Sequence, residues 1–413
     1  MTQQNAAAYA AYGDHTAATD RADYAALLAT LRESEPAFIA IRHDLHAHPE
    51  LGFEETRTAR LVAQSLAQWG YEVTTGVGGT GVVGQLRRGS SPRAIGLRAD
   101  MDALPIEEAT GLPYASTVAK TMHACGHDGH TAILLAAAHH LAMHGRFDGT
   151  LNLIFQPAEE GLGGAARMIE DGLFTRFPCD RVFALHNAPG LPVGHFAVRH
   201  GCMLASSDSV TITVTGRGGH DAMPHLASDP VVAAASIVMA LQSIVARNIE
   251  PTRAAVVTVG AIHAGQAGNV IPETATLQLS VRALDGETRN TLEARIREIA
   301  TLQAQSYGAT ATVDYRAISR PLVNERVSTD LAIDTIEALA GAAALTRLPD
   351  AIMGSEDFSW MTEHLPGCYV LLGNGVGQTG GCVVHNPAYD FNDAAITWGA
   401  AWFVALSERY LHA

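Results

Sequence analysis

A thiol and an imidazole stand two residues apart in the segment MHACGHDGH, where Cys125 and His127 flank a glycine. On a tight turn these side chains can face one cation, and the neighbouring Asp128 could fix the tautomer of a ligating ring. The alternative is an ordinary buried cysteine beside surface histidines, because cysteine is among the most buried residue types. Three histidines, one cysteine and one aspartate within nine residues favour a metal site.

Two adjacent carboxylates, Glu159 and Glu160, follow a proline in the segment QPAEEGLGGA. Neighbouring side chains in a non-helical turn can point in different directions, so one could bind a metal while the other takes a proton from a metal-bound water. The residue pattern alone does not say which glutamate does which. The competing interpretation is a solvated helix N-terminus, where acidic residues are favoured by the helix dipole.

Two single histidines complete the candidate ligands: His186 ends the apolar segment RVFALH, and His385 lies in CVVHNPAYDFND. A histidine that follows a strand is more often structural, so each gains weight only as part of a cluster. With Cys125, His127 and one glutamate they make five ligands of mixed S, N and O type. That number is too large for one closed tetrahedral site but suits two metals that share a bridging water, which favours catalysis over structural zinc.

Predicted strands bring these groups together from distant parts of the sequence. Asp100 and Asp102 follow the strand AIGLRAD, Glu159 and Glu160 follow LNLIFQP, and His186 follows RVFAL. The carboxyl ends of strands in an open α/β sheet are where ligand sites form. We therefore expect one cluster at this edge of the sheet.

Helices and strands alternate up to residue 205 and again after Pro321, which predicts an α/β catalytic domain whose mixed sheet is covered by helices. Between these parts the pattern is β-α-β-β-α-β, the ferredoxin-like arrangement, and residues 229–249 form its first helix, long and amphipathic. A small α+β unit thus interrupts the larger domain. The expected segments are a tail over residues 1–22, the catalytic domain over 23–205 and 318–413, and the inserted domain over 206–317.

Composition limits the partners and the compartment. The formal net charge is −15, from 42 acidic and 27 basic residues, which argues against nucleic acid or an anionic membrane as a partner. Five cysteines without paired spacing fit a reducing compartment, and the N-terminus has neither a basic start nor an apolar run of signal-peptide length. We expect a cytoplasmic protein.

Eight segments resemble, in order, motifs of the M20 metallopeptidase family, specifically the amidohydrolase branch of hippurate hydrolases, N-acyl-amino-acid amidohydrolases and auxin-conjugate hydrolases. They are RHDLHAHPELGFEE, LRADMDALPI, MHACGHDGHTA, FQPAEEGLGGA, GRGGHDAMPH, GNVIPE, GSEDF and HNPAYDFND. The resemblance covers about residue 36 to residue 410. It implies a zinc-peptidase-like catalytic domain with an inserted lid or dimerisation domain, Glu159 as general base, and a two-metal centre held by Cys125, His127, Glu160, His186 and His385.

The resemblance also implies roles for residues of the lid. His220 would stabilise the oxyanion, often across a dimer interface, although Asp221 departs from the small residue usual beside this histidine. Asn269 and Arg282 would hold the substrate carboxylate, for which an arginine fork is geometrically suited. The alternative for Arg282 is a charge on a strand surface.

These features predict hydrolysis of N-acyl amino acids, such as N-benzoyl, N-acetyl or related conjugates, by a homodimer or dimer-based oligomer. The thiolate ligand favours Zn²⁺, while the other ligands also admit Mn²⁺, Co²⁺ or Ni²⁺. One alternative is a dipeptidase or aminopeptidase of the same family. Another is a metal-binding scaffold that has lost activity, although no expected ligand or base is missing.

Overall fold

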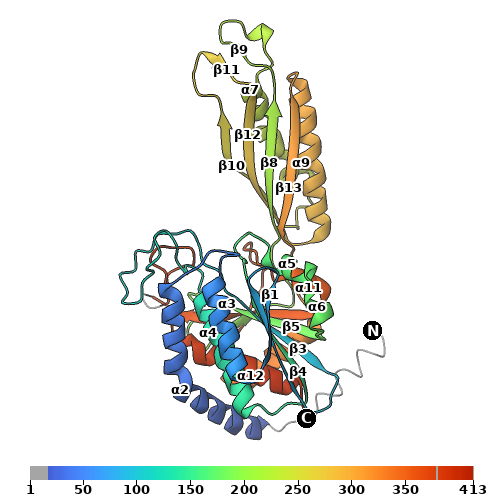
Figure 1. Ribbon diagram of the computed structural model, residues 1–413. Helices are drawn as coiled ribbons and strands as arrows, with labels where there is room; N and C mark the ends of the chain where they lie inside the picture. Colours follow the sequence, from blue (N-terminus) through green and yellow to red (C-terminus); the bar gives the residue numbers. More distant parts are fainter. Residues whose placement is uncertain (1–16, 378–379, 413) are drawn as a thin grey trace.

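The computed structural model describes residues 17–377 and 380–412 and has two domains (Figure 1). A long, narrow lid stands on a broader catalytic domain, and the chain enters the lid once and returns. This arrangement confirms the α/β catalytic domain with an inserted ferredoxin-like α+β domain. The tail expected over residues 1–22 lies, up to residue 16, outside the described residues, and helix α2 begins at Ala17.

One mixed sheet of eight strands, in the order β1-β2-β4-β3-β5-β16-β6-β15, forms the centre of the catalytic domain. Its central strands β4, β3, β5 and β16 run parallel, whereas β1, β2 and β6 join it through antiparallel pairs. Strand β3 is buried along its whole length, as expected where both faces are covered. The bounds are β1 Glu72–Val77, β2 Gly81–Arg88, β3 Ala94–Asp100, β4 Gly149–Gln156, β5 Arg181–Pro189, β6 Phe196–Val198, β15 Leu345–Arg347 and β16 Gly367–Gly375.

Helices cover both faces of this sheet because its strands carry apolar side chains alternately toward each face. On β4, for example, Leu153 and Phe155 point into the larger core, and Ile154 points into the smaller one. The larger core is closed by α2 Ala17–Ala47, α3 Thr56–Gln68, α4 His127–His144, α10 Arg326–Ala340 and α12 Ala395–Tyr410. The smaller core is closed by α5 Gly164–Glu170, α6 Leu173–Arg176 and α11 Ser359–His364.

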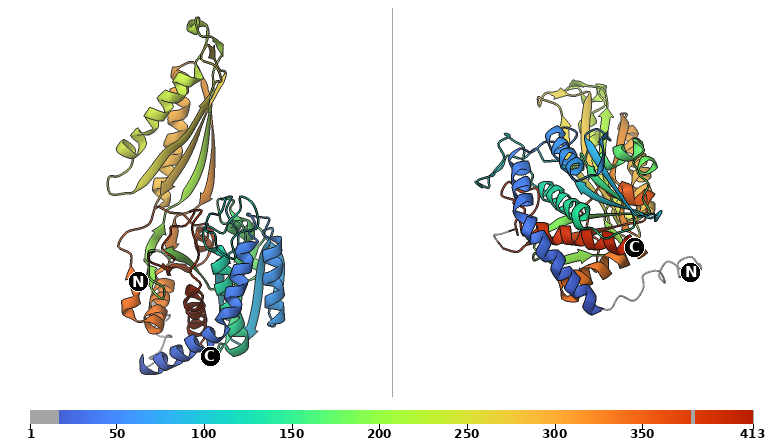
Figure 2. Two further views of the ribbon diagram at one scale, coloured as in Figure 1. Left: turned by 90° about the vertical axis from the view of Figure 1, so that its left-hand side faces the viewer. Right: turned by 60° about the horizontal axis from the view of Figure 1, so that its bottom comes forward.

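The lid has its own sheet, in the order β10-β12-β8-β13, and its own core. Burial alternates along β12, so only one face of the sheet is apolar, and Figure 2 shows the helices on that one side. In this core, Ile212 of the sheet packs with the helix residues Ile237 and Ile296. The bounds are β8 Ser207–Thr215, α7 Pro230–Leu241, α8 Ser243–Asn248, β10 Ala255–Ala264, β12 Thr274–Ala283, α9 Gly286–Ser306 and β13 Thr310–Ser319.

Short elements mark the two ends of the lid. At its base, the chain enters and leaves through an antiparallel pair, β7 Gly201–Leu204 with β14 Leu322–Asn324. At its far end, β9 Gly219–His220 pairs with β11 Val270–Ile271 beside the turn Pro224–Leu226, and Figure 1 shows this tip pointing away from the catalytic domain.

The structure divides a helix that the sequence pattern predicts as single: residues 229–249 form α7 and α8, which meet at Gln242. A similar break separates α5 from α6, where Gly172 has a φ of 82°. By length and composition alone, the segment Pro230–Asn248 could cross a membrane. In the structure, Ile237 and Leu241 of this segment lie in the lid core.

Candidate metal centre and active site

The turn that carries the thiol depends on a glycine. Cys125 precedes α4, His127 begins it, and Gly126 between them has a φ of 93°. A side chain at Gly126 would also meet Asn187 and the Tyr389 hydroxyl, since an added Cβ would lie 2.5 Å from each. Only glycine therefore allows Cys125 and His127 to be presented from this tight turn.

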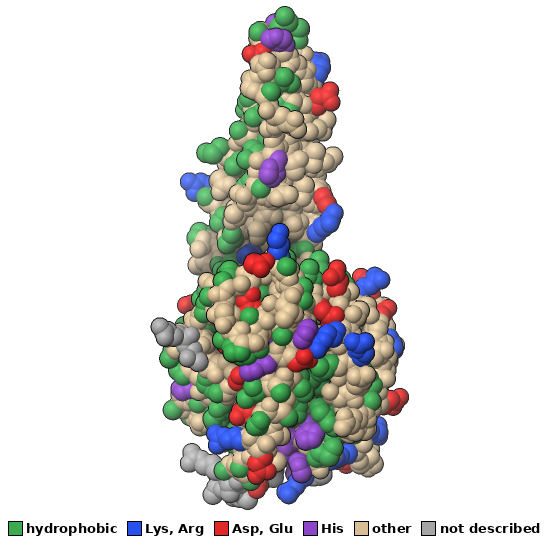
Figure 3. Space-filling model, turned by 60° about the vertical axis from the view of Figure 1, so that its left-hand side comes forward, with side chains coloured by type: hydrophobic (Ala, Val, Ile, Leu, Met, Phe, Trp, Pro, Cys, Tyr) green, Lys and Arg blue, Asp and Glu red, His purple; other side chains and the backbone are tan. Residues whose placement is uncertain are grey.

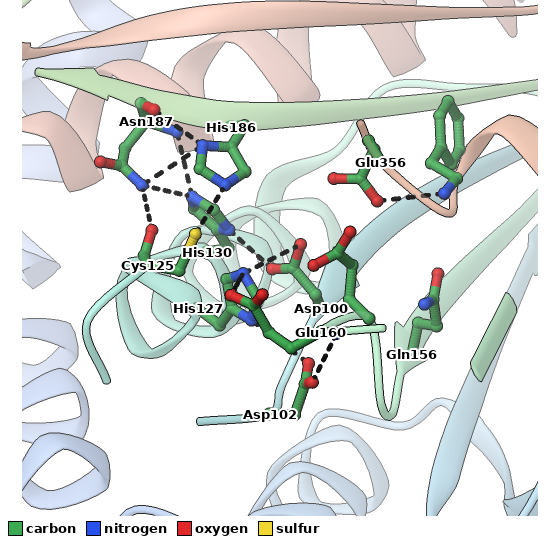
Figure 4. Close-up of polar contacts among 12 residues, drawn as sticks. Asp100, Asp102, Cys125, His127, His130, Gln156, Glu160, His186, Asn187 and Glu356 are labelled. Atoms are coloured by element: carbon green, nitrogen blue, oxygen red, sulfur yellow. Dashed lines mark hydrogen bonds and ion pairs between the residues drawn. The ribbon is translucent and has the colours of Figure 1, made fainter. Parts of the chain in front are cut away.

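Cys125 lies next to His186, a predicted ligand on strand β5. Its Sγ lies 3.3 Å from Nε2 of His186, which is on β5 (Figure 4). The other ring nitrogen of His186 donates to the carbonyl of Asn187 over 2.7 Å, which leaves Nε2 as the nitrogen with a free lone pair. Burial lowers the pKa of His186 well below its usual value, so the ring is in the neutral form that binds metals.

His127 is held from one side and unpartnered on the other. Its Nδ1 lies 3.2 Å from Oδ1 of Asp102, a contact that orients the ring. Its Nε2 has no hydrogen-bond partner among the described residues, although the side chain is completely buried. This buried nitrogen lies 4.0 Å from Oε1 of Glu160. A metal ion between the two atoms would give the nitrogen the partner that it lacks.

Glu160 and His385 form the other half of the cluster. The Nε2 of His385 lies 3.2 Å from Oε1 of Glu160, and hydrogen bonds to Cys125 and Glu160 raise the pKa of His385 to about 10. The raised value reflects negative charge that a bound cation would also neutralise. Within 4.8 Å, the ligand atoms form two groups, Cys125 with His127 and His186, and Cys125 with Glu160 and His385. The structure thus brings all five predicted ligands together, and the two groups share the thiol.

Glu159 lies beside these ligands and differs from Glu160 in its contacts. Its Oε1 accepts a hydrogen bond from the backbone N–H of Asp357 over 3.3 Å, whereas the backbone N–H of Glu160 donates to Asp102 over 2.9 Å. Desolvation raises the pKa of Glu159 well above its usual value, and the carboxylates of Glu356 and Glu160 raise it further. A carboxyl group with a raised pKa can both accept and return a proton near neutral pH.

Beneath the ligands is a buried charged network that the sequence pattern did not reveal. Arg98, 1% exposed, forms ion pairs with Asp100 at 2.7 Å, Glu356 at 2.9 Å and Asp357 at 3.3 Å. Asp100 also lies 2.6 Å from Nδ1 of His130. A charged residue in the apolar strand AIGLRAD was a signal of this network, because buried arginines need partners, and the motif GSEDF contains Glu356 and Asp357.

The predicted lid residues are separate from this cluster within one chain. His220, with 66% of its side chain exposed, and Asn269 lie at the tip, where the carbonyl of Asn269 accepts from the N–H of Asp221. Arg282 lies at the base and donates to the carbonyl of Met353 over 2.8 Å. Asn269 and Arg282, to which the resemblance gives the substrate carboxylate, thus lie at opposite ends of the lid sheet within a single chain.

The ligand chemistry fits a pair of divalent cations. Thiolate, imidazole and carboxylate groups are all present. Asp102 orients the ring of His127 and Asn187 orients the ring of His186. The buried Nε2 of His127 has no hydrogen-bond partner among the described residues, so it is available to bind a metal. Zn²⁺ accepts every member of such a set, and Mn²⁺ accepts its oxygen and nitrogen members.

Comparison with known proteins points to the same chemistry. Residues 96–409 match the family described as peptidase family M20/M25/M40. The chain is 46% identical to a hippurate hydrolase of Campylobacter jejuni, over 93% of this chain and 99% of that protein. It is 37% identical to an N-acetyl-L-cysteine deacetylase of Bacillus subtilis, over 91% of this chain and 89% of the relative.

Further relatives extend the comparison to plants and to a solved structure. An IAA-amino acid hydrolase of Arabidopsis thaliana is 39% identical over 90% of this chain and 85% of its own length. A dinuclear metal-binding peptidase of the M20 family from Bacillus subtilis superimposes with a TM-score of 0.77 at 32% identity, over 91% of this chain and 98% of its own.

Proposed function

We propose that this chain, which belongs to the peptidase family M20/M25/M40, hydrolyses the amide bond of N-acyl amino acids and releases a carboxylic acid and an amino acid. The chain is a metal-dependent amidohydrolase with a site for two divalent ions. The observation that carries the proposal is the shared site itself: two groups of ligands meet at Cys125, and the carboxylate of Glu159 lies within reach of His127 and Glu160.

Glu159 is the general base in the proposed reaction. Two bound divalent ions supply the polarisation of the amide carbonyl and the lowered pKa of the attacking water. Glu159 accepts the proton of that water and returns it to the departing amine, as its raised pKa allows. The N–H of Asp357 keeps the Glu159 carboxylate oriented during both transfers.

The native ions are proposed to be Zn²⁺ or Mn²⁺, and Co²⁺ or Ni²⁺ would also fit. A thiolate favours Zn²⁺, while occupancy of the imidazole and carboxylate positions also follows metal availability. Elemental analysis of the protein purified without added metal distinguishes these ions.

The acidic residues near the site support acyl substrates over free amines. A dipeptidase or aminopeptidase needs a carboxylate for the substrate ammonium group. Glu356 and Asp357 are 3% and 1% exposed and are paired with Arg98, so neither is available as such an anchor. An N-acyl substrate, which has no free α-amine, needs no such group.

We propose that the chain acts as a homodimer through its lid. Helix α7 exposes Val231, Val232 and Met239, the last by 73%, and strand β10 is an edge of the lid sheet. An exposed apolar face beside an open strand edge suits an isologous interface with a second copy. The other occupant of this face would be a different protein, which the measured mass of the assembly would reveal.

In such a dimer, the tip of one lid could complete the partner's site. Figure 3 shows histidine and hydrophobic side chains gathered at the end of the lid, where Met223, Leu226 and Val270 are each at least half exposed. We propose that His220 from this tip donates a hydrogen bond to the developing oxyanion, and that Asn269 or Arg282 contacts the substrate carboxylate. The position of His220, away from its own chain's cluster, supports action across the interface.

A cytoplasmic location is part of the proposal. All five cysteines are free thiols, which is typical of proteins in a reducing compartment, and the acidic net charge offers no basic surface for an anionic membrane.

A hydrolysis screen tests the proposed function. The protein is dialysed against Mn²⁺ or Zn²⁺ and offered N-benzoyl, N-acetyl and indole-acetyl amino acids together with dipeptides. We expect turnover of N-acyl amino acids in preference to dipeptides. Preference for dipeptides would favour the peptidase alternative. No turnover of any substrate would favour the alternative that the protein is an inactive metal-binding scaffold.

A further inference from the structure

Ala158, which precedes the catalytic glutamates, has an unusual backbone conformation. Its φ is 53°, a left-handed value that residues with a side chain seldom adopt. Only four non-glycine residues in the described part of the chain have a positive φ, and His385, a predicted metal ligand, is another of them. Such strain persists only where the surroundings enforce it, and it is concentrated at functional sites.

A buried carboxylate holds Ala158 in this conformation. The Oε1 of Glu55 accepts the backbone N–H of Ala158 over 2.8 Å, and its Oε2 accepts the hydroxyl of Thr80. Glu55 is 0% exposed and comes from the start of α3, far from residue 158 in sequence. Each of its oxygens accepts one of these hydrogen bonds, and Glu55 belongs to none of the groups of close ligand atoms among the described residues.

Glu55 is free for this role because another residue caps its helix. The side chain of Glu55, at the N-cap of α3, makes no capping hydrogen bond. Instead, the carboxylate of Glu50 accepts the N–H groups of Arg57 and Thr58 over 2.9 and 2.8 Å. An acidic residue at an N-cap normally bonds its own helix, so its reach to Ala158 indicates a different use.

The turn is held on both sides of Glu159. Glu55 binds the N–H of Ala158 just before it, and Asp102 binds the N–H of Glu160 just after it. Gly52 packs directly beneath, since an added Cβ there would lie 3.0 Å from the Cα of Ala158. The carboxylate of Glu159 therefore points toward the ligands from a turn whose flanking amides are both fixed by acidic side chains.

We propose that Glu55 is a positioning residue for the general base: by accepting the N–H of Ala158 it keeps the turn left-handed and so sets the direction of the Glu159 carboxylate. The inference rests on the proposed role of Glu159. It assigns to Glu55 neither metal binding nor proton transfer. A displacement of about 1 Å in a catalytic group can lower a rate by about 100-fold, so a small relaxation of this turn has a large kinetic effect.

The test compares two substitutions of Glu55 at full metal occupancy. Glu55→Leu removes the acceptor, and we expect kcat to fall by about 10- to 100-fold with little change in KM. Glu55→Gln keeps an oxygen for Ala158 and turns its amide toward the Thr80 hydroxyl, which can accept, so kcat should stay within about threefold of wild type. A kcat in Glu55→Leu within twofold of wild type, or an equal loss in both variants, would overturn the proposal.

A second substitution separates positioning from a general loss of stability. A glycine at position 158 accepts a positive φ without a side-chain penalty. The kcat of Glu55→Leu/Ala158→Gly should therefore be at least about threefold higher than that of Glu55→Leu. The control is Glu325→Leu, which likewise removes a carboxylate that accepts backbone hydrogen bonds, here from the two N–H groups of Val327 and Ser328 at the start of α10. We expect Glu325→Leu to lower Tm and leave kcat unchanged. Failure of the glycine to restore activity, or an equal loss of kcat in the control, would contradict a positioning role.

A structural readout keeps this test independent of the substrate. In a crystal structure of Glu55→Leu we expect residue 158 to leave the left-handed region and the Glu159 carboxylate to lose its contact with the N–H of Asp357. An unchanged turn would refute the role of Glu55. Failure of the wild-type protein to hydrolyse any N-acyl amino acid would refute the proposed function and leave this comparison valid.

Discussion

The Sγ of Cys125 lies 3.3 Å from Nε2 of His186, although 61 residues separate the two in the sequence. The contact joins the turn before α4 to strand β5, and Cys125 belongs to both groups of ligands in the cluster. Burial raises the pKa of the Cys125 thiol, and the charge of Glu160 raises it further, so a thiolate here requires a nearby positive charge. The geometry therefore supports the proposal that this cysteine binds a metal ion.

Cys125→Ser should lose about one of the two bound ions per chain, because a serine hydroxyl is a poor replacement for a thiolate. We expect kcat to fall by at least about 100-fold, since both positions of a two-metal site contribute to the reaction. Metal content by elemental analysis and hydrolysis rates on the same samples provide the measurement. Cys202→Ser is the control, because that thiol donates to the carbonyl of Leu204 and belongs to neither group of predicted ligands, and the variant should retain both ions. Full metal content in Cys125→Ser would contradict the assignment.

The pair of His46 and Asp128 predicts how stability depends on pH. Burial is the largest single influence and lowers the pKa of His46. The charge and hydrogen bond of Asp128, 2.8 Å away, together with a hydrogen bond to Glu108, outweigh it and raise the pKa to about 9 from an ordinary value of 6.5. Since the folded-state pKa lies above the unfolded-state value, the stabilisation is complete below pH 6.5 and is lost as pH rises to about 9. The slope over this window is at most about 1.4 kcal/mol per pH unit.

Thermal unfolding of His46→Gln measures this contribution. The difference in Tm between wild type and variant should be largest at pH 6 and should shrink steadily toward pH 9.5. His200→Gln, which removes a half-exposed partner of Asp330, serves as a control for an ordinary surface pair and should change Tm little. A difference for His46→Gln that stays constant from pH 6 to pH 9.5 would show that the pair does not titrate in this range.

The fold could be predicted from the sequence because its patterns are local. Alternation along β8 and β12 and the apolar run of α4 each specify one element, and the order of elements distinguishes the inserted domain from the catalytic one. The division at Gln242 was missed, because apolar periodicity continues across this break. The strands β6, β7, β14 and β15 have only three or four residues each, too few for a periodic pattern.

The site was only partly predictable, because many of the residues that meet there lie far apart in the sequence. Strand ends indicated where ligands would gather. The separate roles of Glu159 and Glu160 depend on what each carboxylate meets, the N–H of Asp357 for Glu159 and Nε2 of His385 for Glu160, and that follows from tertiary contacts. Arg98 pairs with Glu356, 258 residues away, so no local pattern shows the pair. The position of His220 depends on how the lid is set on its base, which no motif determines.

Complementation between two inactive variants tests whether His220 acts across a dimer. Mixed dimers of His220→Ala and Glu159→Gln contain one site with an intact Glu159 and an intact His220 from the partner. Equal co-expression should therefore restore about a quarter of wild-type activity per chain if the histidine acts in trans. If His220 acts within its own chain, every site in the mixture lacks one group, and activity should stay at the level of the separate variants.

The most direct test of the account is hydrolysis of N-benzoylglycine by wild type and Glu159→Gln, each loaded with Mn²⁺ or Zn²⁺ and checked for metal content. We expect wild type to release benzoate and glycine in equal amounts. We expect Glu159→Gln, with both ions bound, to be slower by at least about 1000-fold, because it cannot accept the proton of the attacking water. A fully metal-loaded Glu159→Gln variant with wild-type kcat would contradict the account.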